Sequence, residues 1–378
     1  MVRRVPTRFL LFPCALLASL LLGGCAQNPA ATSAAHRDNG DRRASWHQRS
    51  RSTLLAAVSS AATADLDAEE SLALSNYFQA QNYSGITLRR GSGNHLEVRA
   101  KINDREGVFL IDTGAQITVV NRASLGKFNL SAVKTSVKVY GALGGPGEKI
   151  EAALASSIQL GPCTVSPFLL GVSDLGTLNS GRQHGRGEAR FDGIIGADLL
   201  QNFSFVIDCR TPRLYAKDVR TPDGSSSAAE AAHPGLGSLL RGRDYVEVGM
   251  KKVAISDFEI NANVNRRRAV LLVDTGAAIT LFDRTLSQEA GIDFRRTDYV
   301  VGGAGGGRQR IAIGTVNNLQ INGLQVRQTQ IAISDISGLG AQLQERGRTP
   351  LDGYLGADFL RQKGAVIDCA GLKLYLKN

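Results

Sequence analysis

Two four-residue apolar runs, Val108–Ile111 and Val270–Val273, each end at an aspartate that is followed by Thr-Gly-Ala and a second apolar segment. Similar short runs, some continuous and some alternating with polar residues, are broken by Gly and Asn through most of the chain after residue 83. Runs of this length and punctuation are typical of β-strands. We therefore predict a mainly-β chain with one short helix after Gly196 and one after Gly356.

The chain can be laid on itself, which indicates that one structural unit is written twice. The matching segments are residues 96–103 with 258–265 and Asp112 with Asp274 at a shift of 162, then residues 192–198 with 352–358 and 206–209 with 366–369 at a shift of 160. One small insertion or deletion separates the two blocks. We therefore expect two lobes of similar structure, each with its own core.

These repeats and the segments around them divide the chain into five parts. The parts are a lipoprotein signal peptide at residues 1–25, a tether with a candidate helical pro-segment at residues 26–82, a first lobe at residues 83–218, a linker at residues 219–244 and a second lobe at residues 245–378. The linker is biased toward Pro, Gly, Ser and Ala, a composition that fits a domain boundary.

The first residues have the form of a bacterial export signal. A basic start precedes an apolar run that is too short for a stable membrane span. Leu-Gly-Gly-Cys, which ends at Cys25, resembles a lipobox, in which the Cys becomes the acylated first residue of the mature protein. The alternative is an ordinary secretory signal with an incidental Cys. Ala26 and Gln27 follow without the Asp that resembles an inner-membrane retention signal, so we expect a lipid anchor in the outer membrane, facing the periplasm.

Composition narrows the classes of function. The chain has 378 residues, 43% of them hydrophobic, and a net charge of +10. Many arginines lie in the tails, where they would face anionic lipid headgroups or simply solvate the tether, and an exported protein rarely meets nucleic acid. No Cys/His spacing typical of a metal site is present, and the body contains only Cys163, Cys209 and Cys369. We expect no nucleic-acid partner, no metal, no cofactor and no framework of disulfides.

Repetition alone does not select the chemically active residues, because Asp192, Asp198 and Asp208 are duplicated as faithfully as Asp112. The local context separates them. A carboxylate that a buried strand carries into a tight glycine turn is costly unless it is paired or hydrogen-bonded. Asp112 and Asp274 have this context, and we predict that they carry the chemistry.

With these neighbours, both repeats resemble the retropepsin-like aspartic proteases of the pepsin clan. The elements that carry the resemblance are Asp-Thr-Gly-Ala at 112–115 and 274–277, the glycine-rich segments 141–147 and 302–307 at the flap positions, Ile194-Ile195-Gly196 and Tyr354-Leu355-Gly356, and the closing hairpins from Phe205 to Tyr215 and from Ala365 to Tyr375. The resemblance implies two β-barrel lobes related by a pseudo-two-fold axis, with the active site between them. Both halves lie in one chain, so we expect a monomer that acts on peptide or protein substrates.

The resemblance also implies a role for each matching residue. Asp112 and Asp274 would be catalytic, and Thr113 and Thr275 would hydrogen-bond across the pseudo-two-fold axis. Gly114 and Gly276 would let the backbone approach the carboxylates, and Ala115 and Ala277 stand where pepsin-like enzymes have a hydroxyl residue. The flaps would be formed by Tyr140, Gly141, Gly144, Gly145, Gly302, Gly303 and Gly305. Two carboxylates about 3 Å apart cannot both ionise, so they share one proton. The missing hydroxyls should raise their pKa and extend activity toward neutral pH.

Other interpretations of the same residues are open. If Asp112 and Asp274 were catalytically inactive, the protein would be a catalytically silent peptide-binding or scaffolding lipoprotein. If residues 53–80 covered the cleft, it would be a proenzyme. The glycines from Gly302 to Gly307 superficially resemble a phosphate loop, but no helix pattern follows them. The structural interpretation assigns Asp192 and Asp352 to turns or caps, Asp208 and Asp368 to hairpin turns, Cys209 and Cys369 to buried thiols, and His184 to a polar loop.

Overall fold

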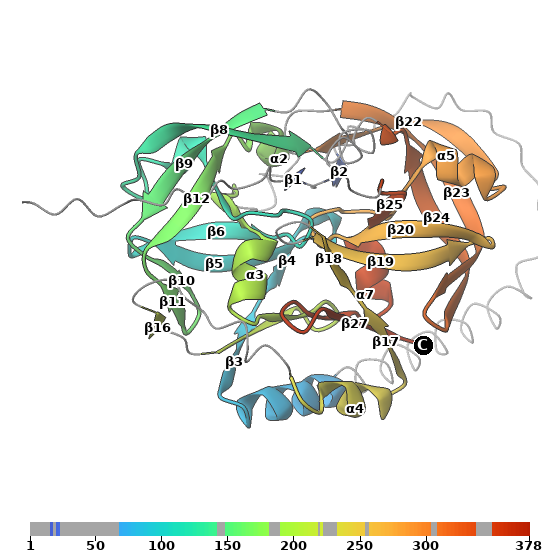
Figure 1. Ribbon diagram of the computed structural model, residues 1–378, viewed down its shortest axis with the longest axis horizontal. Coiled ribbons are helices and arrows are strands. Elements are labelled where there is room, and N and C mark those ends of the chain that lie inside the picture. The colour runs from blue at the N-terminus through green and yellow to red at the C-terminus, as the bar shows by residue number, and fades with distance from the viewer. Residues whose placement is uncertain are drawn as a thin grey trace, which may run out of the picture.

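The computed structural model describes residues 16–17, 20–22, 68–141, 148–180, 190–217, 220–221, 233–253, 257–303, 308–337 and 350–378. Two β lobes lie side by side, with a third sheet beneath them (Figure 1). This confirms the predicted mainly-β, two-lobed fold. Cys25, most of the tether and most of the linker lie outside the described residues.

The first lobe is built on one continuous sheet. Its strands are β4 (Arg89–Arg90), β5 (Leu96–Ile102), β6 (Arg105–Ile111), β7 (Val119–Asn121), β8 (Ala132–Gly141), β9 (Glu148–Ala155), β10 (Ile158–Leu160), β11 (Cys163–Val165), β12 (Phe168–Ser173), β13 (Gly193–Ile195) and β16 (Arg220–Thr221), joined at the flap end by β1 (Leu16–Leu17). β13 runs parallel to β6 and antiparallel to β7. Ile195 therefore lies opposite Ile111, where β6 delivers the first aspartate.

The second lobe repeats this arrangement. Its strands are β18 (Lys251–Val253), β19 (Asp257–Val264), β20 (Arg267–Val273), β21 (Leu281–Asp283), β22 (Phe294–Gly303), β23 (Arg308–Ile321), β24 (Leu324–Ser334) and β25 (Gly353–Leu355), joined by β2 (Leu20–Leu22). β25 runs parallel to β20, with Leu355 opposite Val273. Both aspartates therefore follow buried strands that pair with a parallel neighbour in the same register.

A six-stranded sheet ties the lobes together. Its strands, in order, are β17 (Tyr245–Gly249), β27 (Lys373–Lys377), β26 (Val366–Asp368), β14 (Val206–Asp208), β15 (Arg213–Lys217) and β3 (Tyr83–Thr87). The central pair, β14 and β26, is antiparallel with Ile207 opposite Ile367. These two residues are repeat counterparts, so the pseudo-two-fold axis passes between them.

A helix at residues 68–79 and α4 (Leu236–Arg241) pack beneath this sheet (Figure 1). Phe78 is fully buried and stacks on Tyr215 with ring centroids 4.3 Å apart, and Leu74 and Leu240 join the same apolar cluster. In Figure 1 this base lies at the opposite end of the molecule from the flap strands β8 and β22. Residues 68–79 therefore complete the base of the fold and do not cover the cleft.

The two predicted short helices are present as α3 (Ala197–Asn202) and α7 (Ala357–Gln362). Sequence reasoning did not anticipate η1 (Ser92–Asn94), η2 (Arg122–Ser124), α2 (Gly176–Ser180) or α5 (Arg284–Glu289). Cys209 and Cys369 are buried free thiols, as expected, and Cys163 is buried as well. Among the described residues, no helix has the length and apolar character needed to cross a membrane.

Candidate active site

The two aspartates occupy equivalent, fully buried positions. Asp112 follows β6, and its backbone N–H donates to the carbonyl of Ile195 over 3.0 Å. The N–H of Asp274 donates to the carbonyl of Leu355 over 3.1 Å. Both side chains are 0% exposed. These bonds to β13 and β25 thus fix the backbone position of each buried aspartate.

The turn after each aspartate supplies hydrogen-bond donors to its carboxylate. Oδ1 of Asp112 accepts from the N–H groups of Gly114 and Ala115 at 2.9 and 3.1 Å. In the second lobe, Oδ1 of Asp274 accepts from Gly276 and Ala277 at 2.8 and 2.9 Å. These bonds partly compensate the cost of burying each carboxylate and fix its orientation.

The threonines that follow the aspartates join the lobes at this point. Thr113 Oγ1 donates to the carbonyl of Val273 at 2.7 Å and accepts from the N–H of Thr275 at 3.0 Å. Thr275 Oγ1 makes the reciprocal bonds to the Ile111 carbonyl at 2.8 Å and from the Thr113 N–H at 3.0 Å. The four bonds cross the pseudo-two-fold axis, as the family resemblance implied.

The carboxylates of the two lobes share one site. A Cβ placed on Gly276 would lie 2.3 Å from Cγ of Asp112, so only glycine permits this approach. Burial, and then the negative charge of Asp112, raise the pKa of Asp274 well above its ordinary value. Two carboxyl groups in this relation hold one proton between them over a broad pH range, and their titration belongs to the pair.

A second ring of residues, which sequence reasoning missed, holds the active-site turns. Thr118 Oγ1 donates to Asp198 Oδ1 at 2.7 Å and accepts from the N–H of Gly196 at 3.0 Å. Thr280, Asp358 and Gly356 repeat these bonds in the second lobe at 2.8 and 3.1 Å. Burial raises the pKa of Asp198 to about 6 despite the bonds from Thr118, and burial also raises that of Asp358. The duplicated Thr and Asp positions were the available signal.

The other duplicated aspartates serve the framework. Asp192 and Asp352 accept from the N–H groups of Val108 and Val270, at the starts of the apolar runs that lead to the site. Asp208 and Asp368 accept from backbone N–H groups in the hairpin turns that follow them. These bonds join the four aspartates to the strands and hairpins that frame the site.

The flap hairpins are β8–β9 and β22–β23. Tyr140 and Gly141 end β8, and Gly302 and Gly303 end β22, whereas Gly144, Gly145 and Gly305 lie outside the described residues. Val301, which precedes Gly302 in β22, is fully buried.

Part of the N-terminal apolar run pairs with both flaps, between β8 and β22 in Figure 1. Leu16 and Leu17 lie opposite Tyr140 and Gly141 in parallel register, and Leu22 and Leu21 lie opposite Val301 and Gly302 in antiparallel register. The strands β8 and β22 correspond at a shift of 162, so Tyr140 is the counterpart of Gly302 and Gly141 that of Gly303. The register is therefore symmetric about the midpoint between Leu17 and Leu20. An extended peptide that crosses a two-fold axis must meet one flap parallel and the other antiparallel, and the backbone pairing satisfies this condition.

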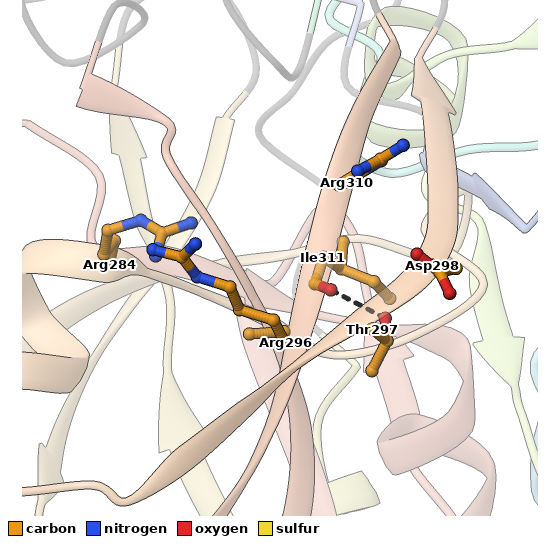
Figure 2. A pocket seen from close by; sticks show the side chains of 7 residues that line it. Arg284, Arg296, Thr297, Asp298, Arg310 and Ile311 are labelled. Atoms are coloured by element: carbon orange, nitrogen blue, oxygen red, sulfur yellow. Dashed lines mark hydrogen bonds between the residues drawn. The ribbon is translucent and has the colours of Figure 1, made fainter.

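A pocket of about 490 Å³ lies at the root of the second flap, away from the aspartates. Figure 2 shows Arg284, from α5, and Arg296, from β22, extending toward each other in it. Thr297 Oγ1 donates to the Ile311 carbonyl at 2.7 Å. Thr135 makes the corresponding bond in the first lobe, so Thr297 belongs to the repeated framework of the flap. No group of residues suited to hold a metal ion is present in the described part of the chain.

The family model for aspartyl proteases matches this chain twice, at residues 98–199 and 260–359. Together the two matches cover more than half of the chain, and each contains one of the buried aspartates. A search of the curated proteins found no match to this chain.

Proposed function

Because the chain belongs to the aspartyl protease family, we propose that it is an aspartic endopeptidase in which Asp112 and Asp274 act together on one water molecule. The observation that carries the proposal is the buried pair itself, one carboxylate from each lobe, fixed by the threonine bonds and the turn amides. A retired site would need none of these features.

The chemistry follows from one proton shared by two carboxyl groups. The ionised carboxylate takes a proton from water, whose oxygen attacks the peptide carbonyl carbon, while the protonated partner gives its proton to the carbonyl oxygen. A tetrahedral diol results. The carbon–nitrogen bond then breaks as the nitrogen takes a proton from one carboxyl group, and the other carboxylate recovers a proton from the diol.

The site offers an atom suited to hold that water. Oδ2 of Asp274 is buried and has no hydrogen-bond partner among the described residues. Its Oδ1, in contrast, is occupied by two turn amides. The proposed mechanism requires only water and two carboxyl groups, so we assign no metal or cofactor to it.

The flaps support a peptide as the ligand. Their strands pair with Leu16 and Leu17 on one side and with Leu20 to Leu22 on the other, in a register that is symmetric about the midpoint between Leu17 and Leu20. The pseudo-two-fold axis also relates the two aspartates, so we expect a peptide bound in this register to present the bond at that midpoint to them. In a synthetic peptide of residues 16–22 we expect cleavage at the bond midway between Leu17 and Leu20.

We propose further that the enzyme works as a monomer in the cell envelope, held by an acylated Cys25 in the outer membrane and facing the periplasm. The lipobox-like sequence and the presence of both aspartates in one chain support this. Replacing Cys25 by Ser should move the protein from the membrane fraction to the soluble fraction. A Cys25→Ser protein that stays with the membrane would contradict a lipid anchor.

Proteome-derived peptides test the activity. Wild type and Asp112→Asn are incubated with the same peptides at near-neutral and acidic pH, and new termini are identified by mass spectrometry. We expect cleavage by wild type alone, with cut sites that define the preference. Binding of peptides by both proteins without cleavage would favour the scaffolding alternative.

A further inference from the structure

A histidine from the first lobe contacts the catalytic turn of the second. His95 is 3% exposed, and its Nε2 lies 3.0 Å from the carbonyl oxygen of Gly276. A carbonyl oxygen only accepts hydrogen bonds, so Nε2 must carry a hydrogen in this contact. The tautomer is thus fixed at this nitrogen, whatever the state of Nδ1.

The accepting carbonyl of Gly276 belongs to a peptide group that also hydrogen-bonds to Asp274. The C=O of Gly276 and the N–H of Ala277 belong to the same peptide group, and that N–H donates to Asp274 Oδ1 at 2.9 Å. Hydrogen bonds in series polarise one another, so a donor at the carbonyl strengthens the bond from the amide to the carboxylate. Electron density drawn toward His95 therefore favours negative charge on Asp274.

We propose that His95 is a positioning residue, which holds the Gly276–Ala277 peptide in place and strengthens its hydrogen bond to Asp274. This role rests on the proposed peptidase function. His95 acts through the peptide group rather than on the substrate, so it should affect the chemical step more than substrate binding.

The segment around His95 is lodged against the second lobe. A Cβ on Gly93 would lie 2.9 Å from Cβ of Ala278, and Arg361, from α7, donates to Oδ1 of Asn94 at 2.9 Å. These contacts hold the imidazole against the turn. The ring therefore needs no rearrangement to keep its bond to Gly276.

His95 has no histidine as its counterpart in the other repeat. The shift of 162 places Asp257 at the counterpart of His95, so the sequence does not repeat the imidazole in the second repeat. The two aspartates consequently have similar turns but different support. His95 would make Asp274 and Asp112 inequivalent within an otherwise symmetric pair.

Two substitutions of similar length separate donation from space filling. His95→Gln keeps an N–H donor, whereas His95→Met keeps the length and apolar stem without one. Steady-state kinetics are measured for the full chain on a peptide that wild type cleaves, and thermal unfolding is followed in parallel. We expect His95→Met to lower kcat about tenfold, roughly the effect of one hydrogen bond, with little change in KM. His95→Gln should keep kcat within about threefold of wild type.

Each other result overturns the role of His95. It is overturned if His95→Met keeps the wild-type kcat or if both variants lose kcat equally. It is also overturned if the substitutions raise KM and leave kcat unchanged. If His95→Met does not fold, His95→Gln decides alone, because a tenfold loss there contradicts donation as the function. Failure of the peptidase proposal has a different signature: wild type cleaves nothing, or Asp274→Asn cleaves as well as wild type, and the role of His95 then falls with it.

Discussion

The threonine bonds between the lobes offer a quantitative test of what holds the site together. Replacing Thr275 by Val keeps the shape of a side chain that is 1% exposed and removes only its hydroxyl. Two bonds disappear: the one donated to the Ile111 carbonyl at 2.8 Å and the one accepted from the Thr113 N–H at 3.0 Å. The reciprocal bonds of Thr113 Oγ1 remain possible, so half of the connection survives.

The expected cost follows from the groups left behind. Thr113 N–H and one acceptor position of the Ile111 carbonyl become buried and unpaired, and an unsatisfied buried group costs about 1–3 kcal/mol. We expect a loss of about 3 kcal/mol in the free energy of unfolding, a large part of the roughly 5–15 kcal/mol that holds a typical domain folded. The melting temperature should fall by about 6 °C or more.

Urea and thermal unfolding, followed by far-ultraviolet circular dichroism, measure this loss. Thr329→Val is the matched control, because Thr329 Oγ1 is also buried but has no hydrogen-bond partner among the described residues. The same chemical change there should be neutral or slightly stabilising. If Thr275→Val costs no more than Thr329→Val, the threonine bonds do not support the site as described.

Two further substitutions probe the turn of the second lobe. Gly276→Ala places a Cβ 2.3 Å from Cγ of Asp112 and should reduce kcat at least about a hundredfold, whereas Gly249→Ala, with nothing within 4 Å of the added Cβ, should not; equal activity of the two variants would refute the close approach. Ala277→Ser adds a donor to a carboxylate whose pKa is raised by burial and by Asp112, so it should favour the ionised form, lower that pKa and move the acid limb of the pH–rate profile down by about 1 unit. An acid limb that stays in place or rises would show that the hydroxyl does not reach the carboxylate.

The sequence predicted the parts of this molecule that local pattern controls. Apolar runs that end at Asp112 and Asp274 became buried strands, and Ala-Asp-Leu-Leu after Gly196 became a helix, because burial and turn chemistry act over a few residues. The two-lobed fold followed from the repeats and from the family resemblance, and the family matches confirm that resemblance. The catalytic roles of the two aspartates stay predictions.

Contacts between distant segments were out of reach. His95 meets a carbonyl 181 residues away, and no repeat counterpart pointed to it. The pairing of the N-terminal run with both flaps also depends on the folded lobes, and its apolar character alone favoured an export signal. The helix at residues 68–79 was anticipated, but its place beneath the six-stranded sheet depends on Phe78 and Tyr215 meeting across the fold.

The central claim is that Asp112 and Asp274 act as one catalytic unit, and peptide turnover by four proteins tests it most directly. Wild type, Asp112→Asn, Asp274→Asn and the double variant are compared on one cleavable peptide across the pH range. When two residues act as one unit, removing either of them abolishes the effect of both. The turnover of each single variant should therefore fall about 10⁴-fold, and that of the double variant little further. A single variant that keeps wild-type turnover, or losses that multiply in the double variant, would contradict the account.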